Sequence, residues 1–161
     1  MIFFTKHGEY FVLETSQTIP AEITKVFSFF ETPRNLDLIT PDWLNFRMLP
    51  PIPIKTFENQ EFQYKLTLHK IRLTWKSRII SYDKNVSFSD KQIKGPYAFW
   101  EHKHLFEKTG DATLMQDIIT YKILPDIFPS ILASTVNRLF IQRDLKTIFR
   151  YRQKRIIEIF G

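Results

Sequence analysis

The chain has 161 residues, a formal net charge of +6 and 43% hydrophobic residues, and it contains no cysteine. This length suits one domain with one core, so we expect residues 1–161 to form a single domain. The lack of cysteine excludes a disulfide scaffold, a thiolate nucleophile and metal centres held by cysteine sulfur. The sequence has no apolar run of membrane-spanning length, and its apolar start is too short for a signal peptide. We therefore expect a cytoplasmic protein without stable membrane insertion.

The first part of the chain predicts one strand, two short helices and a rigid connection. Alternating apolar residues predict a strand over Tyr10–Ile19. A helix is expected to begin at Pro20 and to end at Thr32-Pro33, and a second short helix covers Pro33–Leu38. Residues 39–54 are rich in proline, which predicts an extended connection, and their apolar side chains indicate that it packs on the core.

From residue 61 the apolar residues recur with a period of two. This pattern predicts strands over residues 61–68, 73–79, 86–90, 97–106 and 113–124. A turn at Thr109-Gly110-Asp111 joins the last two strands as a hairpin. Short connections between successive strands favour an antiparallel meander.

The longest predicted element is a helix from Ser130 to Phe160, which contains no proline or glycine. Its apolar residues form two stripes on nearly opposite sides of the helix. The change falls near residue 140, so the helix either bends there or has a second apolar surface to cover. The early apolar stripe consists of Leu132, Val136, Leu139 and Phe140, and the later stripe consists of Ile141, Leu145, Ile148, Phe149, Ile156 and Ile159.

Much of the positive charge lies on this predicted helix. The basic residues are spread around it, and Asp144 and Glu158 interrupt them. Cations near the C-terminus of a helix also complement its dipole. We interpret them as a solvated helical face and expect no nucleic-acid partner.

Four stretches of the sequence point to a family. They are IPAEITKVFSFFETPRNLDLITPDWLNF, GPYAFWEHKHLFE, TLMQDIITYKILP and RLFIQRDLKTIFRYRQKRI. With the order of elements, they resemble the START-like (SRPBCC) superfamily, in its bacterial ligand-binding and polyketide cyclase-like branch. The resemblance implies an α+β helix-grip fold: a seven-stranded curved antiparallel sheet around the long C-terminal helix, with two short helices after the first strand. It also implies a cavity for a hydrophobic or aromatic small molecule, and no cofactor.

Strand parity predicts which side chains of residues 97–106 enter this cavity. Trp100, His102 and His104 share a face with a core position at the hairpin return. We therefore predict that these three point inward and that Glu101 and Lys103 face solvent.

The partner strand adds Asp117 and Tyr121 to the same interior. A buried carboxylate needs a hydrogen-bonding partner, which His102 or His104 would supply. One interpretation is a structural polar cluster that contacts the helix through Arg143 or Arg152.

Two further interpretations of His102, His104 and Asp117 remain open. They form the polar end of a ligand pocket, or they hold iron or zinc as two imidazoles and one carboxylate. Two histidines two residues apart are a weak metal signal, and we expect no metal.

The cavity wall and its entrance are expected to come from distant parts of the sequence. Tyr64, Trp75, Phe88 and Ile79 have inward parity. The segment Ile123–Pro129 and the first turns of the helix are predicted to form a movable entrance, with a fixed dimer contact as the competing account. The expected ligand-binding residues are Tyr64, Trp75, Phe88, Trp100, His102, His104, Asp117, Tyr121, Phe128 and Arg143.

The leading functional hypothesis is a carrier or sensor that binds a hydrophobic or aromatic small molecule, including a lipid. The alternative is a cofactor-free cyclase or dehydratase that uses His102, His104 and Asp117 as acid–base groups. A third hypothesis is a protein-interaction module that presents the early apolar stripe, which would also allow a homodimer.

Overall fold

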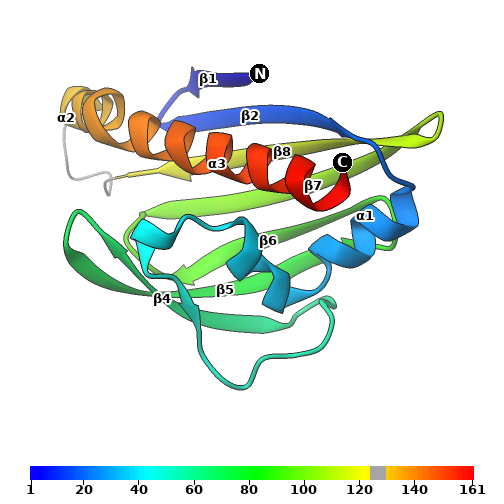
Figure 1. The fold of residues 1–161 in the computed structure, drawn as a ribbon. Helices are drawn as coiled ribbons and strands as arrows, with labels where there is room; N and C mark the ends of the chain where they lie inside the picture. The colour runs from blue at the N-terminus through cyan, green and yellow to red at the C-terminus, as the bar shows by residue number, and fades with distance from the viewer. Residues whose placement is uncertain (124–129) are drawn as a thin grey trace.

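The computed structural model describes residues 1–123 and 130–161. Within these residues, eight strands form one antiparallel sheet in the order β1-β2-β8-β7-β6-β5-β4-β3 (Figure 1). The strands are β1 (Ile2–His7), β2 (Tyr10–Ile19), β3 (Arg47–Met48), β4 (Glu61–Leu68), β5 (Ile71–Asp83), β6 (Ser87–Lys94), β7 (Phe99–Thr109) and β8 (Ala112–Lys122).

The expected number of seven strands is wrong, because the described sheet has eight. The sequence patterns missed the two strands at the sheet edges. β1 pairs with β2 through a tight turn in which Gly8 has φ +61°. Its residues Ile2, Phe3 and Phe4 are consecutive apolar residues without alternation. β3 has only two residues and pairs with Lys65 and Tyr64, so no period was available to detect it.

The two short helices that were expected near the start are present. The first is α1 (Ile23–Phe30), which buries Val26 and Phe27. The second is a 3₁₀ helix over Pro33–Ile39, and a third short turn, also 3₁₀, covers Asp42–Leu44. The connection that follows returns to the sheet edge through β3. The predicted packing of the apolar side chains of residues 39–54 holds for the buried Leu44 and Met48, whereas Trp43 and Ile54 are exposed.

The terminal helix is one helical run with a change of winding. It consists of α2 (Ser130–Val136), a π-helical turn over Asn137–Ile141, and α3 (Gln142–Phe160). A π turn inserts one residue relative to α-helical winding, which rotates every later side chain about the axis. The change of winding falls near residue 140, where the two predicted stripes change direction.

The two stripes have different surroundings. Leu132, Leu139 and Phe140 of the early apolar stripe are exposed, whereas Val136 is half-buried. Leu145, Phe149 and Ile156 of the later stripe are buried against the sheet. No described helix is both long and apolar enough to cross a lipid bilayer.

Two clusters of buried side chains join the sheet to the helices. One gathers around Phe27 of α1 and includes Phe88 and Phe106 of the sheet. The other brings Trp75, Trp100 and Tyr121 of the sheet against Leu145 and Phe149 of α3. Each fully buried large apolar side chain contributes about 1.5–3 kcal/mol, so these clusters fix α3 along the concave face of the sheet. Figure 1 shows this helix lying along the curved sheet.

Candidate functional site

A cavity of about 230 Å³ lies between the concave face of the sheet, α3 and the 3₁₀ segment. Most of its wall is apolar or aromatic. The aromatic side chains that line it are Phe29, Phe30, Phe46, Phe62, Tyr64, Trp75, Phe88, Tyr97, Trp100 and Phe149.

Trp75 is the centre of one aromatic wall. It stacks on Tyr64, its cross-strand partner, with ring centroids 5.9 Å apart and planes 15° apart. The Trp100 ring meets the Trp75 ring edge to face at 5.2 Å. The indole Nε1–H of Trp75 donates a 3.0 Å hydrogen bond to Ser77 Oγ. Such paired rings are held in place by cross-strand packing, and they offer a flat apolar surface.

Two carboxylates and two imidazoles form a row across three neighbouring strands. Asp90 on β6 is the cross-strand partner of His102 on β7. His104, two residues further along β7, is the partner of Asp117 on β8. Because side chains two residues apart share a face of a strand, all four point to the concave side.

The predicted parity of this strand is confirmed. Trp100, His102 and His104 are buried, and Lys103 is exposed. Glu101 is half-buried, so its separation from the interior is less complete than that of Lys103.

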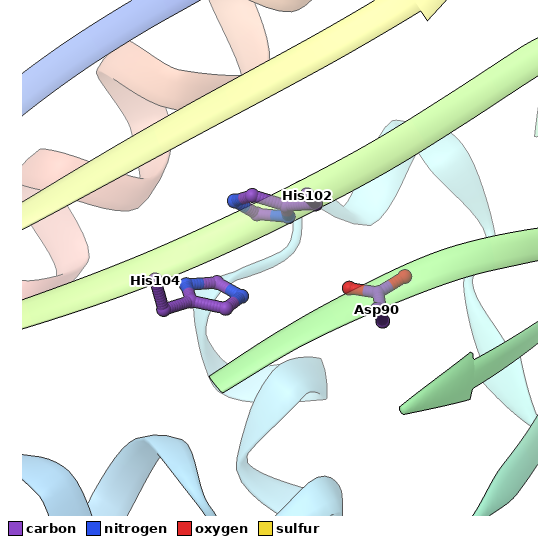
Figure 2. A group of neighbouring side chains, drawn as sticks. All are labelled: Asp90, His102 and His104. Atoms are coloured by element: carbon purple, nitrogen blue, oxygen red, sulfur yellow. The ribbon is translucent and has the colours of Figure 1, made fainter. Parts of the chain in front are cut away.

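Asp117 contacts both histidines from behind. His102 Nε2 forms a 2.8 Å hydrogen bond with Asp117 Oδ1. His104 Nδ1 lies 2.8 Å from the same oxygen but is not aligned with it as a hydrogen bond. Figure 2 shows the remaining nitrogen of each ring on the side of the Asp90 carboxylate.

Burial and this contact set the charge states of the row. Burial lowers the pKa of His102 to about 3, and the neighbouring His104 acts in the same direction. Burial alone would favour the neutral acid at Asp117, but the contacts from His102 and His104 outweigh it and lower the pKa of Asp117. The consistent arrangement is an ionised Asp117 that accepts the Nε2 proton of a neutral His102. The Nδ1 atom of His102 then carries a lone pair.

Arg152 brings a positive charge to the same cavity from α3. Its side chain is only 9% exposed, and it packs on the Phe149 ring at 4.8 Å. Its buried Nε has no hydrogen-bond partner among the described residues. Burial lowers the pKa of Arg152 and raises the pKa of Asp90, which also lines the cavity. A buried N–H donor without a partner is uncommon, and a bound water, ion or ligand atom is one explanation for it.

The structure separates the predicted ligand-binding residues other than Arg143 into three groups. Asp117 and Tyr121 are buried behind the wall: Asp117 against the histidines, and Tyr121 with its hydroxyl donating a 2.7 Å hydrogen bond to Asn137 Oδ1. Phe128, and the predicted entrance from residue 124 to Pro129, lie outside the described residues. The predicted residues that line the cavity are Tyr64, Trp75, Phe88, Trp100, His102 and His104.

The structure places Arg143, a predicted ligand-binding residue, away from the cavity. Its side chain is exposed and does not line the cavity. At 100° per residue, position 143 lies on the opposite side of the helix from position 152. Arg152 shares the buried side with Leu145 and Phe149, and this stripe was the signal that identifies it.

Asp90 is the site residue that sequence reasoning missed. It is two residues from Phe88, which was predicted to point inward, so parity alone places its carboxylate on the same face. Its position beside His102 follows from the β6–β7 register.

No protein-family model and no curated protein matches the chain. Solved structures match it in fold. A protein from Arthrobacter aurescens has a TM-score of 0.70 at 11% identity, covering 97% of this chain and 91% of its own. Ara h 8.0201 has a TM-score of 0.62 at 13% identity, covering 94% and 97%. The major latex-like protein 151 from Panax ginseng has a TM-score of 0.55 at 13% identity, covering 87% and 97%.

The chain has the helix-grip fold of Bet v 1-like proteins. Identities this low establish the fold alone, and the bacterial cyclase-like branch stays a prediction. The expected α+β class, with an antiparallel sheet and a long C-terminal helix, is confirmed.

Proposed function

We propose that this helix-grip protein binds a hydrophobic or aromatic small molecule in the cavity between the sheet and α3. The main support for this proposal is an aromatic-lined cavity of about 230 Å³. Arg152 is buried in its wall, and the Nε atom of Arg152 has no hydrogen-bond partner among the described residues. Ligand sites commonly combine an apolar wall with a few convergent polar groups. The flat part of the ligand would lie on Trp75 and Tyr64, and its polar end would face Arg152.

The size and polarity of the cavity narrow the ligand class. Its volume lies below the roughly 300–1,000 Å³ that is typical of small-molecule sites, so a compact ring system suits it better than a long chain. An oxygen at the polar end would accept the unpaired N–H of Arg152, and hydrogen bonds to charged groups are worth about 1.5–3 kcal/mol. We therefore favour an aromatic or polycyclic molecule with one acidic or carbonyl group.

A fluorescent probe tests this proposal directly. Anilinonaphthalene sulfonate has a flat apolar body and one anionic end, and we expect it to bind with enhanced fluorescence. Leu66→Trp should fill the cavity that Leu66 lines and abolish this binding. Ile71→Trp on the neighbouring strand is the matched control, because Ile71 is exposed. Equal probe binding by both variants would contradict the proposal, and mass spectrometry of molecules extracted from the wild-type protein would identify a natural ligand.

An acid–base enzyme is a second candidate, supported by the two imidazoles in the cavity wall. The lowered pKa makes His102 a weak base near neutral pH, so its Nδ1 lone pair would serve to accept a hydrogen bond from a ligand hydroxyl. Cyclisation of a reactive substrate would then rely mainly on its confinement. With a polyketide-like substrate, an enzyme would lose turnover in His104→Gln while retaining binding, whereas a carrier would show no turnover in either protein.

A further inference from the structure

We propose that Asp90, His102 and His104 form a binding site for one divalent transition-metal ion, of the zinc or ferrous-iron class, in the wall of the cavity. One ligand atom from each of the three side chains lies within 4.8 Å of the others (Figure 2). This inference does not depend on the organic ligand proposed above.

The three donors have the chemistry of a metal site with open positions. Two imidazole nitrogens and one carboxylate oxygen are a set that zinc and non-haem iron both accept. Metal–ligand bonds of about 2.0–2.2 Å require donor atoms somewhat closer together than 4.8 Å, so small side-chain rotations must accompany binding. Because only three protein groups take part, a water molecule or an oxygen of a bound molecule would complete the coordination.

The backbone fixes these donors to rigid elements. Asp90 and His102 are directly paired across β6 and β7, and His104 follows two residues along β7 on the same face. No loop supplies a donor, so the positions of the three Cβ atoms are set by the hydrogen-bonded sheet. Sites on strands are held more tightly than sites on loops.

Asp117 occupies the place of a supporting carboxylate. Its Oδ1 lies 2.8 Å from Nε2 of His102 and 2.8 Å from Nδ1 of His104. Metal-binding histidines usually contact a carboxylate through the nitrogen that does not hold the metal, which fixes the orientation of the ring. Here Asp117 orients the His102 ring through a hydrogen bond and lies beside the His104 ring, and each ring directs its other nitrogen toward Asp90 (Figure 2). The sequence had suggested Asp117 as the third ligand, and the structure places Asp90 there instead.

The charges nearby favour a cation with an associated anion. Asp90 and Asp117 each provide a negative charge when ionised, and Arg152 provides a positive one. A divalent ion would leave this group with one net positive charge. An anionic oxygen donor would neutralise this net positive charge. It could bridge the metal ion and Arg152, because Arg152 lines the same cavity.

Metal titration of the chelator-treated, full-length protein tests the proposal. We expect Zn²⁺ to bind at about one ion per chain by calorimetry, and Co²⁺ to give the visible absorption of nitrogen- and oxygen-coordinated cobalt. Asp90→Asn and His104→Gln should each weaken Zn²⁺ binding at least tenfold. Asp117→Asn should weaken it about 10–100-fold, because it disturbs the orientation of the rings.

His7→Gln and His69→Gln are the matched controls for these histidine variants. Both side chains are on the surface and outside the cavity lining, so Zn²⁺ affinity should not change. The proposal is overturned if the wild-type protein binds no Zn²⁺ or Co²⁺, or if the surface variants lose affinity while Asp90→Asn and His104→Gln keep it. If a cavity variant fails to fold, the Co²⁺ spectrum of the wild-type protein and of His69→Gln still decides the question.

Discussion

The two apolar stripes of the terminal helix contain similar residues but differ in solvent exposure. Phe149, on the inner side of α3, is 2% exposed and packs against His102 with ring centroids 5.9 Å apart. Phe140, in the π turn, is 51% exposed. The difference teaches that helical periodicity predicts an apolar side of a helix but not whether another element covers it.

The largest expected effect compares these two phenylalanines. Phe149→Ala should lower the free energy of unfolding by about 3–5 kcal/mol, because it opens a cavity in the packed core. Phe140→Ala should change it by less than about 0.5 kcal/mol in a monomer. Urea denaturation of both variants checks this, and equal losses would mean that the early apolar stripe is covered, for example by a second copy of the chain. Sedimentation velocity would then test the homodimer that the sequence left open.

A substitution at Asp117 tests the row of carboxylates and imidazoles that α3 covers. Asp117→Ala should cost about 3 kcal/mol or more, because it removes the buried partner of two imidazoles. The exposed Asp83 is the matched control, and Asp83→Ala should cost less than about 0.5 kcal/mol. An unchanged denaturation midpoint for Asp117→Ala would rule out the paired arrangement.

Acid should destabilise the metal-free protein through His102. Its pKa is about 3 in the folded state, below the ordinary value of 6.5, so between these values the unfolded chain binds a proton that the folded chain does not. The free energy of unfolding should therefore fall as pH decreases below 6.5, by up to about 1.4 kcal/mol per pH unit. The lowered pKa of Asp117 adds a further loss as pH falls below 3.8.

Urea melts between pH 7 and pH 4.5 would measure the contribution of His102. His102→Gln removes the titrating group and should flatten the pH dependence, whereas His69→Gln should keep the wild-type slope. If His102→Gln and the wild-type protein lose stability in parallel, His102 is not buried in its neutral form.

A substitution at the junction between the two stripes should give the smallest loss of unfolding free energy. Asn137 is buried in the π turn and accepts a 2.7 Å hydrogen bond from the Tyr121 hydroxyl. Asn137→Ala should cost about 1–3 kcal/mol, because it strands a buried hydroxyl. When Tyr121→Phe is already present, Asn137→Ala should lower the free energy of unfolding by less, because no hydroxyl is left without a partner. Additive losses in this double-mutant cycle would show that the two side chains are not coupled.

Local sequence patterns were sufficient for the inner strands, the helices and one face of the site, but not for the edge strands β1 and β3. The period of two along Trp100, His102 and His104 determined that these side chains are buried, because a one-residue change would turn all of them to solvent. The continuous apolar pattern after Ser130 also determined a long helix. The buried stripe of that helix contained enough information to choose Arg152 over Arg143, since their positions differ by half a turn in direction.

The tertiary structure alone decided which strands meet and what covers each surface. The β6–β7 register brings Asp90 opposite His102, and the β7–β8 register places Asp117 behind the same histidines. Parity says which side of a strand a residue occupies, but register depends on the packing of the whole sheet. Asn137 in the π turn likewise meets its hydrogen-bonding partner, the Tyr121 hydroxyl, only through the contact between helix and sheet. Composition and periodicity describe one element at a time, and these contacts exist only where two elements meet.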